Sequence, residues 1–340
     1  MWLAPLIASA ALGYESDTLT DRHLPLPDVT TALDERVQDI VIDAIATVNQ
    51  QTRCRAEPQT MHHRLAHVIH ARLSANELVP ARRGIASMGF DRLSAWIEKG
   101  GVSRRAFDDR RDIFGSAGLR HSVLLTWAGV CSTVRVNGVL IGTDKLDHFF
   151  EEGYHQWRRG EQGVDWATST ENGWFGLKSS GTFSFADLRA NADGARFFGD
   201  LLSKGGVATL DAAGCLAPAT PFTWRDYVTN EYDEVHNPPV YLPLVGEAVS
   251  RHLDLNRDAY CADYAVWGGP EHEAQLAATL AARPAYVGDR APERTDPYRL
   301  AERCADWIAP EGPYVSPTGQ PPQDGIARQR DGRRDPTGGL

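Results

Sequence analysis

The chain has 340 residues and a formal net charge of -10 at pH 7, and hydrophobic residues make up 42% of it. This composition is typical of a folded globular protein rather than a disordered or membrane protein. No apolar run reaches the roughly 18 residues that span a bilayer. The negative charge disfavours nucleic acid and anionic membranes through repulsion. The sequence therefore predicts no membrane span and no nucleic-acid partner.

The two ends of the chain differ from its centre. Residues 1–12 combine a short apolar stretch with small residues, which is typical of the end of a secretory signal peptide. Residues 309–340 are rich in Pro, Gly, Gln and Arg and have little to bury, so they predict a disordered tail. Between them we expect a single domain over residues 20–308.

Five cysteines occur, and none of them forms a C-x-x-C pair, which excludes a structural zinc ribbon. In an exported protein we expect one or two disulfides and one thiol left over. One hypothesis for the pairing joins Cys261 to Cys304. That bridge closes a loop of about 44 residues and would stabilise the fold by roughly 4 kcal/mol.

The first half of the chain predicts helices followed by one hairpin. Apolar residues at helical spacing predict a helix over residues 31–49, opened by a capping box of Thr31 and Asp34. Further helices are expected over about 60–73 and 90–99. Residues 133–141 then read TVRVNGVLI, and an Asn-Gly pair between two β-branched runs predicts a hairpin. The expected fold class is mainly α (α+β).

A helix is expected directly after the hairpin, over residues 144–157, with Thr143 as its N-cap. Residues 160–184 are rich in Gly, Ser, Thr, Asn and Trp and predict a loop or a small antiparallel flap. Ser184 and Asp187 form a capping box that opens the next helix, FADLRANADGARFFGDLLSK. Mixed helix and loop are expected from about 224 to 308.

The helix 144–157, DKLDHFFEEGYHQW, carries residues that can perform acid–base chemistry. Its spacing predicts His148, Glu151 and His155 on one face, with Glu152 four residues after His148. The two neighbouring phenylalanines would desolvate a carboxyl group and raise its pKa, as a general acid for glycoside cleavage requires. The same spacing also fits a surface helix whose acidic residues pair with nearby lysine and arginine.

Three blocks of sequence between residues 142 and 241 resemble a group of exported bacterial proteins. They read GTDKLDHFFEEGY, FADLRANADGARFF and WRDYVTNEYDEVHNP. The group includes lysozyme-superfamily enzymes that act on deacetylated peptidoglycan. The resemblance implies one lysozyme-like catalytic domain over residues 20–308, with a helical core, a small hairpin or flap and helical extensions. It also implies cleavage of peptidoglycan glycan strands by a secreted or periplasmic monomer, with no cofactor and no metal.

Within this resemblance the general acid is Glu152 or Glu151, and Glu152 is preferred because Gly153 follows it. His148 and Tyr154 would orient the acid or a water molecule. The residues expected to contact substrate are Asp144, Lys145, Asn191, Trp174 and Asp187, and a second carboxylate is available at Asp165, Glu171 or Asp187. The net charge of -10 would attract the amines of a deacetylated wall.

Two other functions compete with glycoside cleavage. In a metal-dependent envelope hydrolase, nitrogen and oxygen ligands would come from one helical face, namely Asp144, His148, Glu151 and His155. A further histidine cluster, MHHRLAHVIH, could bind a transition metal through His63 and His67, or form polar surface. In a non-catalytic envelope-binding protein, residues 230–241 would be a recognition loop. Alternatively, Asp233, Glu234 and Asn237 in that loop cap neighbouring backbone.

Overall fold

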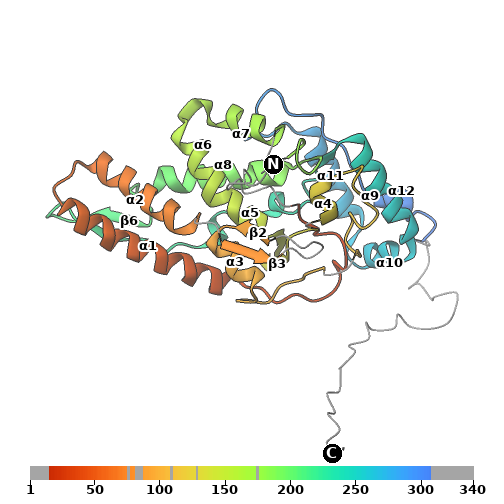
Figure 1. The fold of residues 1–340 in the computed structure, drawn as a ribbon, viewed down its shortest axis with the longest axis horizontal. Helices are drawn as coiled ribbons and strands as arrows, with labels where there is room; N and C mark the ends of the chain where they lie inside the picture. The colour runs from red at the N-terminus through yellow and green to blue at the C-terminus, as the bar shows by residue number, and fades with distance from the viewer. Residues whose placement is uncertain are drawn as a thin grey trace, which may run out of the picture.

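The computed structural model describes residues 15–74, 77–80, 87–107, 110–127, 129–173 and 176–307. The predicted signal segment 1–12, the predicted tail 309–340 and Trp174 lie outside the described residues. The described chain is mainly helical, and its strands form small antiparallel pairs. The predicted mainly α (α+β) class is therefore confirmed (Figure 1).

Two long helices, α1 (Thr30–Thr52) and α2 (Pro58–Leu73), lie side by side at one end of the molecule (Figure 1). Both helices face the main apolar core with fully buried aliphatic side chains. The predicted capping box is wrong, because α1 begins at Thr30, whose backbone N–H donates to Asp28. The Asp34 carboxylate instead accepts the backbone N–H of Trp224 at 2.8 Å.

The predicted hairpin is confirmed as β3 (Thr133–Val136) paired with β4 (Val139–Gly142). Asn137 and Gly138 form its turn with φ values of 52° and 78°, the left-handed conformation that this turn requires. The hairpin buries its valines in the main core. The other elements before it are β1 (Glu77–Pro80), β2 (Ser87–Phe90), α3 (Arg92–Glu98) and α4 (Val123–Trp127).

The central helix follows the hairpin and contains a wider turn. Its three parts are α5 (Asp144–Asp147), the π-helical turn η1 (His148–Glu152) and α6 (Gly153–Arg158). Thr143 occupies the N-cap position, but its hydroxyl donates to the Glu98 carboxylate at 2.8 Å rather than capping the helix. The central helix packs on α8 (Phe185–Asp200), which Ser184 caps through the backbone N–H of Asp187, as predicted.

The loop or flap predicted for residues 160–184 is wrong for its first half, because residues 160–171 are helical, whereas the described residues after them form turns and one short strand. In its helical part Asp165 and Ser169 are exposed, while Ala167, Thr168 and Glu171 face inward. The segment ends in a strand that pairs with a distant one rather than with a neighbour. Its elements are η2 (Gly160–Gln162), α7 (Gly163–Glu171) and β5 (Thr182–Phe183), which pairs with β8 (Val240–Tyr241).

The chain after α8 adds a hairpin at the α1–α2 end and a helical group at the opposite end (Figure 1). No helix of the described residues is long and apolar enough to cross a membrane. The elements are β6 (Ala208–Leu210), β7 (Leu216–Pro218), η3 (Trp224–Asp226), η4 (Asn230–Tyr232), α9 (Pro243–Leu255), α10 (Arg257–Trp267), α11 (Pro270–Ala281) and α12 (Leu300–Arg303).

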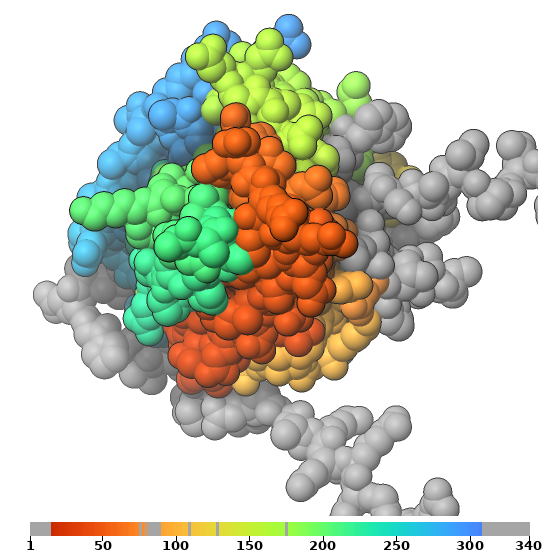
Figure 2. Space-filling view, turned by 90° about the vertical axis from the view of Figure 1, so that its left-hand side faces the viewer, coloured from red at the N-terminus to blue at the C-terminus, as the bar shows by residue number. Residues whose placement is uncertain are grey.

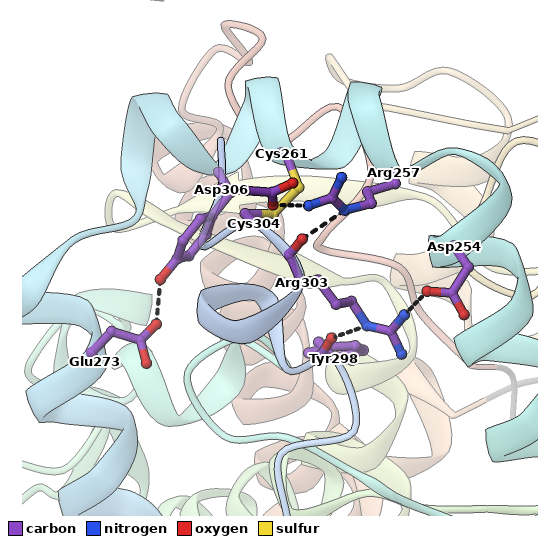
Figure 3. The surroundings of a disulfide bond; sticks show 9 residues. Asp254, Arg257, Cys261, Glu273, Tyr298, Arg303, Cys304 and Asp306 are labelled. Carbon is purple, nitrogen blue, oxygen red and sulfur yellow. Dashed lines mark hydrogen bonds and ion pairs between the residues drawn. A yellow bond between two sulfur atoms is a disulfide. The ribbon is translucent and has the colours of Figure 1, made fainter. Parts of the chain in front are cut away.

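Two disulfides fasten the two ends of the molecule. The predicted bridge between Cys261 and Cys304 is confirmed and joins α10 to the end of α12, where Arg257 also donates to the Arg303 carbonyl (Figure 3). The second bridge joins Cys54, just after α1, to Cys215, so the β6–β7 hairpin lies against α1 and α2 (Figure 2). Cys131 is the buried thiol left over.

Substitution of Gly194 tests the close packing of the central helix on α8. A Cβ atom at Gly194 would lie 1.9 Å from the Phe149 carbonyl oxygen, so we expect Gly194→Ala to cost about 2 kcal/mol or more. Gly199→Ala on the same helix is the control, because its Cβ would meet Trp157 at an ordinary 3.7 Å. Urea unfolding should show the control unchanged or slightly more stable. Equal effects of the two substitutions would contradict this packing.

Candidate functional site

The π-helical turn η1 divides the predicted site residues between two sides of the central helix. The backbone N–H of Gly153 donates to the carbonyl of His148, five residues earlier. Such a turn breaks the 3.6-residue spacing, and turns of this kind are frequent at functional sites. The prediction that His148, Glu151 and His155 share one face is therefore wrong. His148 faces α8, whereas Glu151 contacts α2.

A buried ion cluster lies where the central helix begins. The Lys145 Nζ atom contacts carboxylate oxygens of Asp187 at 2.6 Å and of Asp144 and Glu234 at 2.8 Å each. The Lys145 side chain is completely buried. Burial acts to lower the pKa of Lys145, but the three carboxylates outweigh it and raise that pKa well above its ordinary value. The lysine is therefore charged and is held by three carboxyl groups.

His148 extends this cluster toward Glu152. Its Nε2 atom lies 3.2 Å from Asp187, and its Nδ1 atom lies 3.1 Å from the Asn191 side-chain amide and 3.8 Å from Glu152. Burial acts to lower the pKa of His148, but Asp187 and Glu152 raise it well above its ordinary value. Asp187 responds in the opposite sense, because His148 and Lys145 outweigh its burial and lower its pKa.

Glu152 lies beneath the surface, with 5% of the residue exposed. Burial raises the pKa of its carboxyl to about 7, although the charge of His148 acts against this. The neighbouring Phe149 and Phe150 both pack against Trp224 in the main core, with ring centroids 4.9 and 5.6 Å away. Glu152 therefore has the protonation that a general acid needs, but very little contact with solvent.

A second cluster lies at the surface and joins the central helix to α2. The two Glu151 carboxylate oxygens contact the Nε2 atoms of His70 at 2.7 Å and His155 at 3.1 Å. The side chains of His70, Glu151 and His155 are 16%, 27% and 40% exposed. Burial acts to raise the pKa of Glu151, but hydrogen bonds from His155 and His70 lower it far below its ordinary value. Glu151 is therefore an ionised carboxylate between two imidazoles.

The donor atoms of His70, Glu151 and His155 all lie within 4.8 Å of one another, close enough to hold one metal ion. The His70 ring is fixed by stacking on Tyr154, with ring centroids 4.0 Å apart and planes inclined by 16°. This group corrects the predicted metal set, because Asp144 and His148 belong to the buried ion cluster and not to this one. His70, a member of the predicted histidine cluster, is thereby joined to a carboxylate.

A second set of carboxylates, those of Asp144, Asp187 and Glu234, also converges closely enough for a metal ion. The Lys145 ammonium contacts all three of them and takes the place of a cation there. This arrangement is a structural ion cluster. Asp144, Lys145, Asn191 and Asp187 were expected to contact substrate. All four are buried. Lys145 contacts Asp144 and Asp187, and His148 contacts Asp187 and Asn191, so the role of these residues toward substrate stays a prediction.

The remaining candidates lie in different surroundings. Asp165 is exposed, whereas Glu171 is buried and accepts the backbone N–H of Ser184. In the segment 230–241, Asp233, Glu234 and Asn237 are each at most 1% exposed, and Asp233 accepts the backbone N–H of Val235. These three side chains therefore belong to the interior, and the backbone-capping interpretation is confirmed for Asp233.

The sequence did not reveal that His70 contacts Glu151 or that Glu234 contacts Lys145. His70 lies 81 residues before Glu151, and Glu234 lies 89 residues after Lys145. No local spacing relates residues so far apart. His70 stood in the histidine cluster and Glu234 in the third resembling block, and these were the signals that could have drawn attention to them.

Comparisons of the chain with models of known protein families, with curated proteins and with solved structures give no match.

Substitution of Lys145 tests the buried ion cluster. Lys145→Met leaves three buried carboxylates without their cation, so we expect a loss of about 3–5 kcal/mol in unfolding free energy at pH 7. The matched control is Lys99→Met, which removes a half-exposed contact to Glu77 and should cost no more than about 1 kcal/mol. Chemical denaturation measures both. Equal losses would contradict the cluster.

Proposed function

We propose that this chain is a metal-dependent hydrolase of the bacterial cell envelope. Its ligands are His70, Glu151 and His155, which together hold one divalent ion of the zinc type. The observation that carries the proposal is the convergence of two imidazole nitrogens and one ionised carboxylate at a partly exposed position. No lysine or arginine contributes an ion pair to Glu151 among the described residues, so its charge is available to a cation.

The donor set suits this chemistry. Catalytic zinc sites use three protein ligands, two histidines and a glutamate among them, and leave a fourth position for water. Bonds of that kind place ligand atoms roughly 3.3 Å apart around a tetrahedral ion. The contacts of 2.7 and 3.1 Å from Glu151 to the imidazoles need only small side-chain movements to reach that spacing. The exposure of His155 leaves one side of the group open to solvent.

Residues around such a metal site would hold its ligands in position. The ion would polarise the bond to be cleaved and lower the pKa of a water molecule. Tyr154 holds the His70 ring in place by stacking, and the π-helical turn directs Glu151 toward α2. His70 comes from a different helix than the other two ligands, so the packing of α2 on the central helix fixes the group. These contacts prepare the site before a cation arrives.

Peptidoglycan is the substrate class that we propose, and the support is the resemblance of three sequence blocks to exported wall-acting proteins. The two disulfides are compatible with an exported protein, since such bonds persist in oxidising compartments. We place this hydrolase in the periplasm or outside the cell.

A glycoside hydrolase with Glu152 as general acid is the second candidate function. It is favoured by the burial of the Glu152 carboxyl beside His148, which suits a proton donor. In this alternative no metal ion is bound at Glu151. The 5% exposure of Glu152 ranks it second, because the leaving oxygen of a glycan must reach the acid.

Zinc binding by the purified chain tests the ligand set. We expect one zinc ion per chain in isothermal titration calorimetry, and a cobalt-substituted form with visible absorption of a low-coordinate site. His70→Ala, Glu151→Gln and His155→Ala should each weaken binding by about 100-fold or more, since loss of a neighbouring hydrogen-bond partner alone costs 10–100-fold.

His63→Ala is the matched control, because His63 lies on the same helix but its ring packs, tilted, against Trp157. It should bind zinc as the wild type does. A loss on His63→Ala equal to that on His70→Ala would assign the metal to the His63–His67 pair. A wild-type chain that takes up no zinc would refute the proposal.

Digestion of purified native and deacetylated peptidoglycan separates the two candidate functions. Mass spectrometry should detect fragments from hydrolysed amide bonds, and these should disappear with EDTA and in His155→Ala. Saccharide fragments that resist EDTA and fall about 100-fold in Glu152→Gln would support the glycosidase instead. Glu161→Gln, a substitution of an exposed residue, is the control with unchanged activity. A wild type that releases neither kind of fragment would exclude both.

A further inference from the structure

Arg159 stands out on the surface beside the three metal-ligand candidates. Its guanidinium lies over the Trp166 ring at 3.9 Å from the centroid, and its Nη1 atom donates to the His155 backbone carbonyl at 2.8 Å. The same Trp166 ring lies 6.0 Å from the His155 ring. The Trp166 indole therefore lies beside both the Arg159 guanidinium and His155, which is one of the three candidate metal ligands.

This arginine is held in place but not neutralised. Within the described chain, no carboxylate forms an ion pair with Arg159, although the whole protein carries a net charge of -10. Stacking on an indole and a hydrogen bond to backbone restrict the rotation of a side chain that is otherwise flexible. Arg159 is also exposed, so part of its planar donor set faces solvent. A fixed, uncompensated guanidinium is suited to bind an anion.

We propose that Arg159 binds a carboxylate of the substrate while the bond to be cleaved lies at the site of His70, Glu151 and His155. This inference rests on the proposed function and narrows its substrate class to peptides with a free carboxylate, such as the peptide stems of peptidoglycan. A planar carboxylate matches the paired N–H donors of a guanidinium, and such hydrogen bonds are stronger than neutral ones. A neutral sugar strand offers no partner of this kind.

The residue next to Arg159 provides a comparison. Arg158 is also exposed and carries the same charge. Among the described residues, however, no ring stacks on Arg158 and no backbone contact to a ligand residue holds it. A general attraction of anions to positive surface would involve both arginines alike. A specific carboxylate-binding site at Arg159, in contrast, would not depend on Arg158.

Equilibrium binding tests this inference without requiring turnover. The probes are a stem peptide with a free C-terminal carboxylate and the same peptide with a C-terminal amide, titrated into zinc-loaded protein. We expect the wild type to bind the carboxylate form about tenfold more tightly, as a charge-assisted hydrogen bond of this kind provides. Arg159→Ala should lose this preference, and Arg158→Ala should keep it. Both variants should bind zinc as the wild type does.

Several results would overturn the inference. These are equal binding of the two peptides by the wild type, retention of the preference in Arg159→Ala, loss of the preference in Arg158→Ala, or loss of zinc binding in Arg159→Ala. The last result would make Arg159 a support for His155 only. A wild type that shows the preference but cleaves no wall would uphold the carboxylate site while refuting the proposed hydrolase.

Discussion

The buried contact between Lys145 and three carboxylates is the interaction on which the rest of this structure depends. A charged ammonium with no solvent exposure is stable only among compensating charges, and Asp144, Asp187 and Glu234 supply them from three separate segments of the chain. The cluster thereby fixes the start of the central helix against α8 and against the 230–241 segment. Farther along the central helix, Gly153 faces Gly194 of α8, and these two glycines permit a close approach that no larger residue would allow. The π-helical turn lies between these two points of attachment.

This arrangement places the polar residues of the central helix in two different environments, one buried against α8 and one at the surface beside α2. On the inner side, Asp187 holds His148, and His148 faces Glu152 in a buried polar network. On the outer side, the wider turn presents Glu151 to His70 of α2, and His155 completes the group. In the inner network, Lys145 already occupies the position between the three carboxylates. The outer group has two imidazoles and an ionised carboxylate, and among the described residues no lysine or arginine pairs with it. This difference is why we propose that the chemistry lies on the outer side.

The sequence predicted those features that depend on neighbouring residues. Helical spacing located α1, Asn137-Gly138 located the hairpin, and Ser184 located the start of α8. It failed where distant segments decide the outcome. Thr143 was predicted to cap its helix, but its hydroxyl turns to Glu98 from another helix. The contacts of Lys145 with Glu234 and of Glu151 with His70 join segments more than 80 residues apart, and a π-helical turn has no simple spacing signal.

X-ray absorption spectroscopy of the zinc-loaded chain, combined with anomalous diffraction at the zinc edge, tests the central claim most directly. We predict two imidazole nitrogens and one carboxylate oxygen at about 2.0–2.1 Å from the ion, with the anomalous peak between α2 and the central helix. Zinc bound at any other position, or a coordination shell of water oxygens without imidazole, would contradict the account.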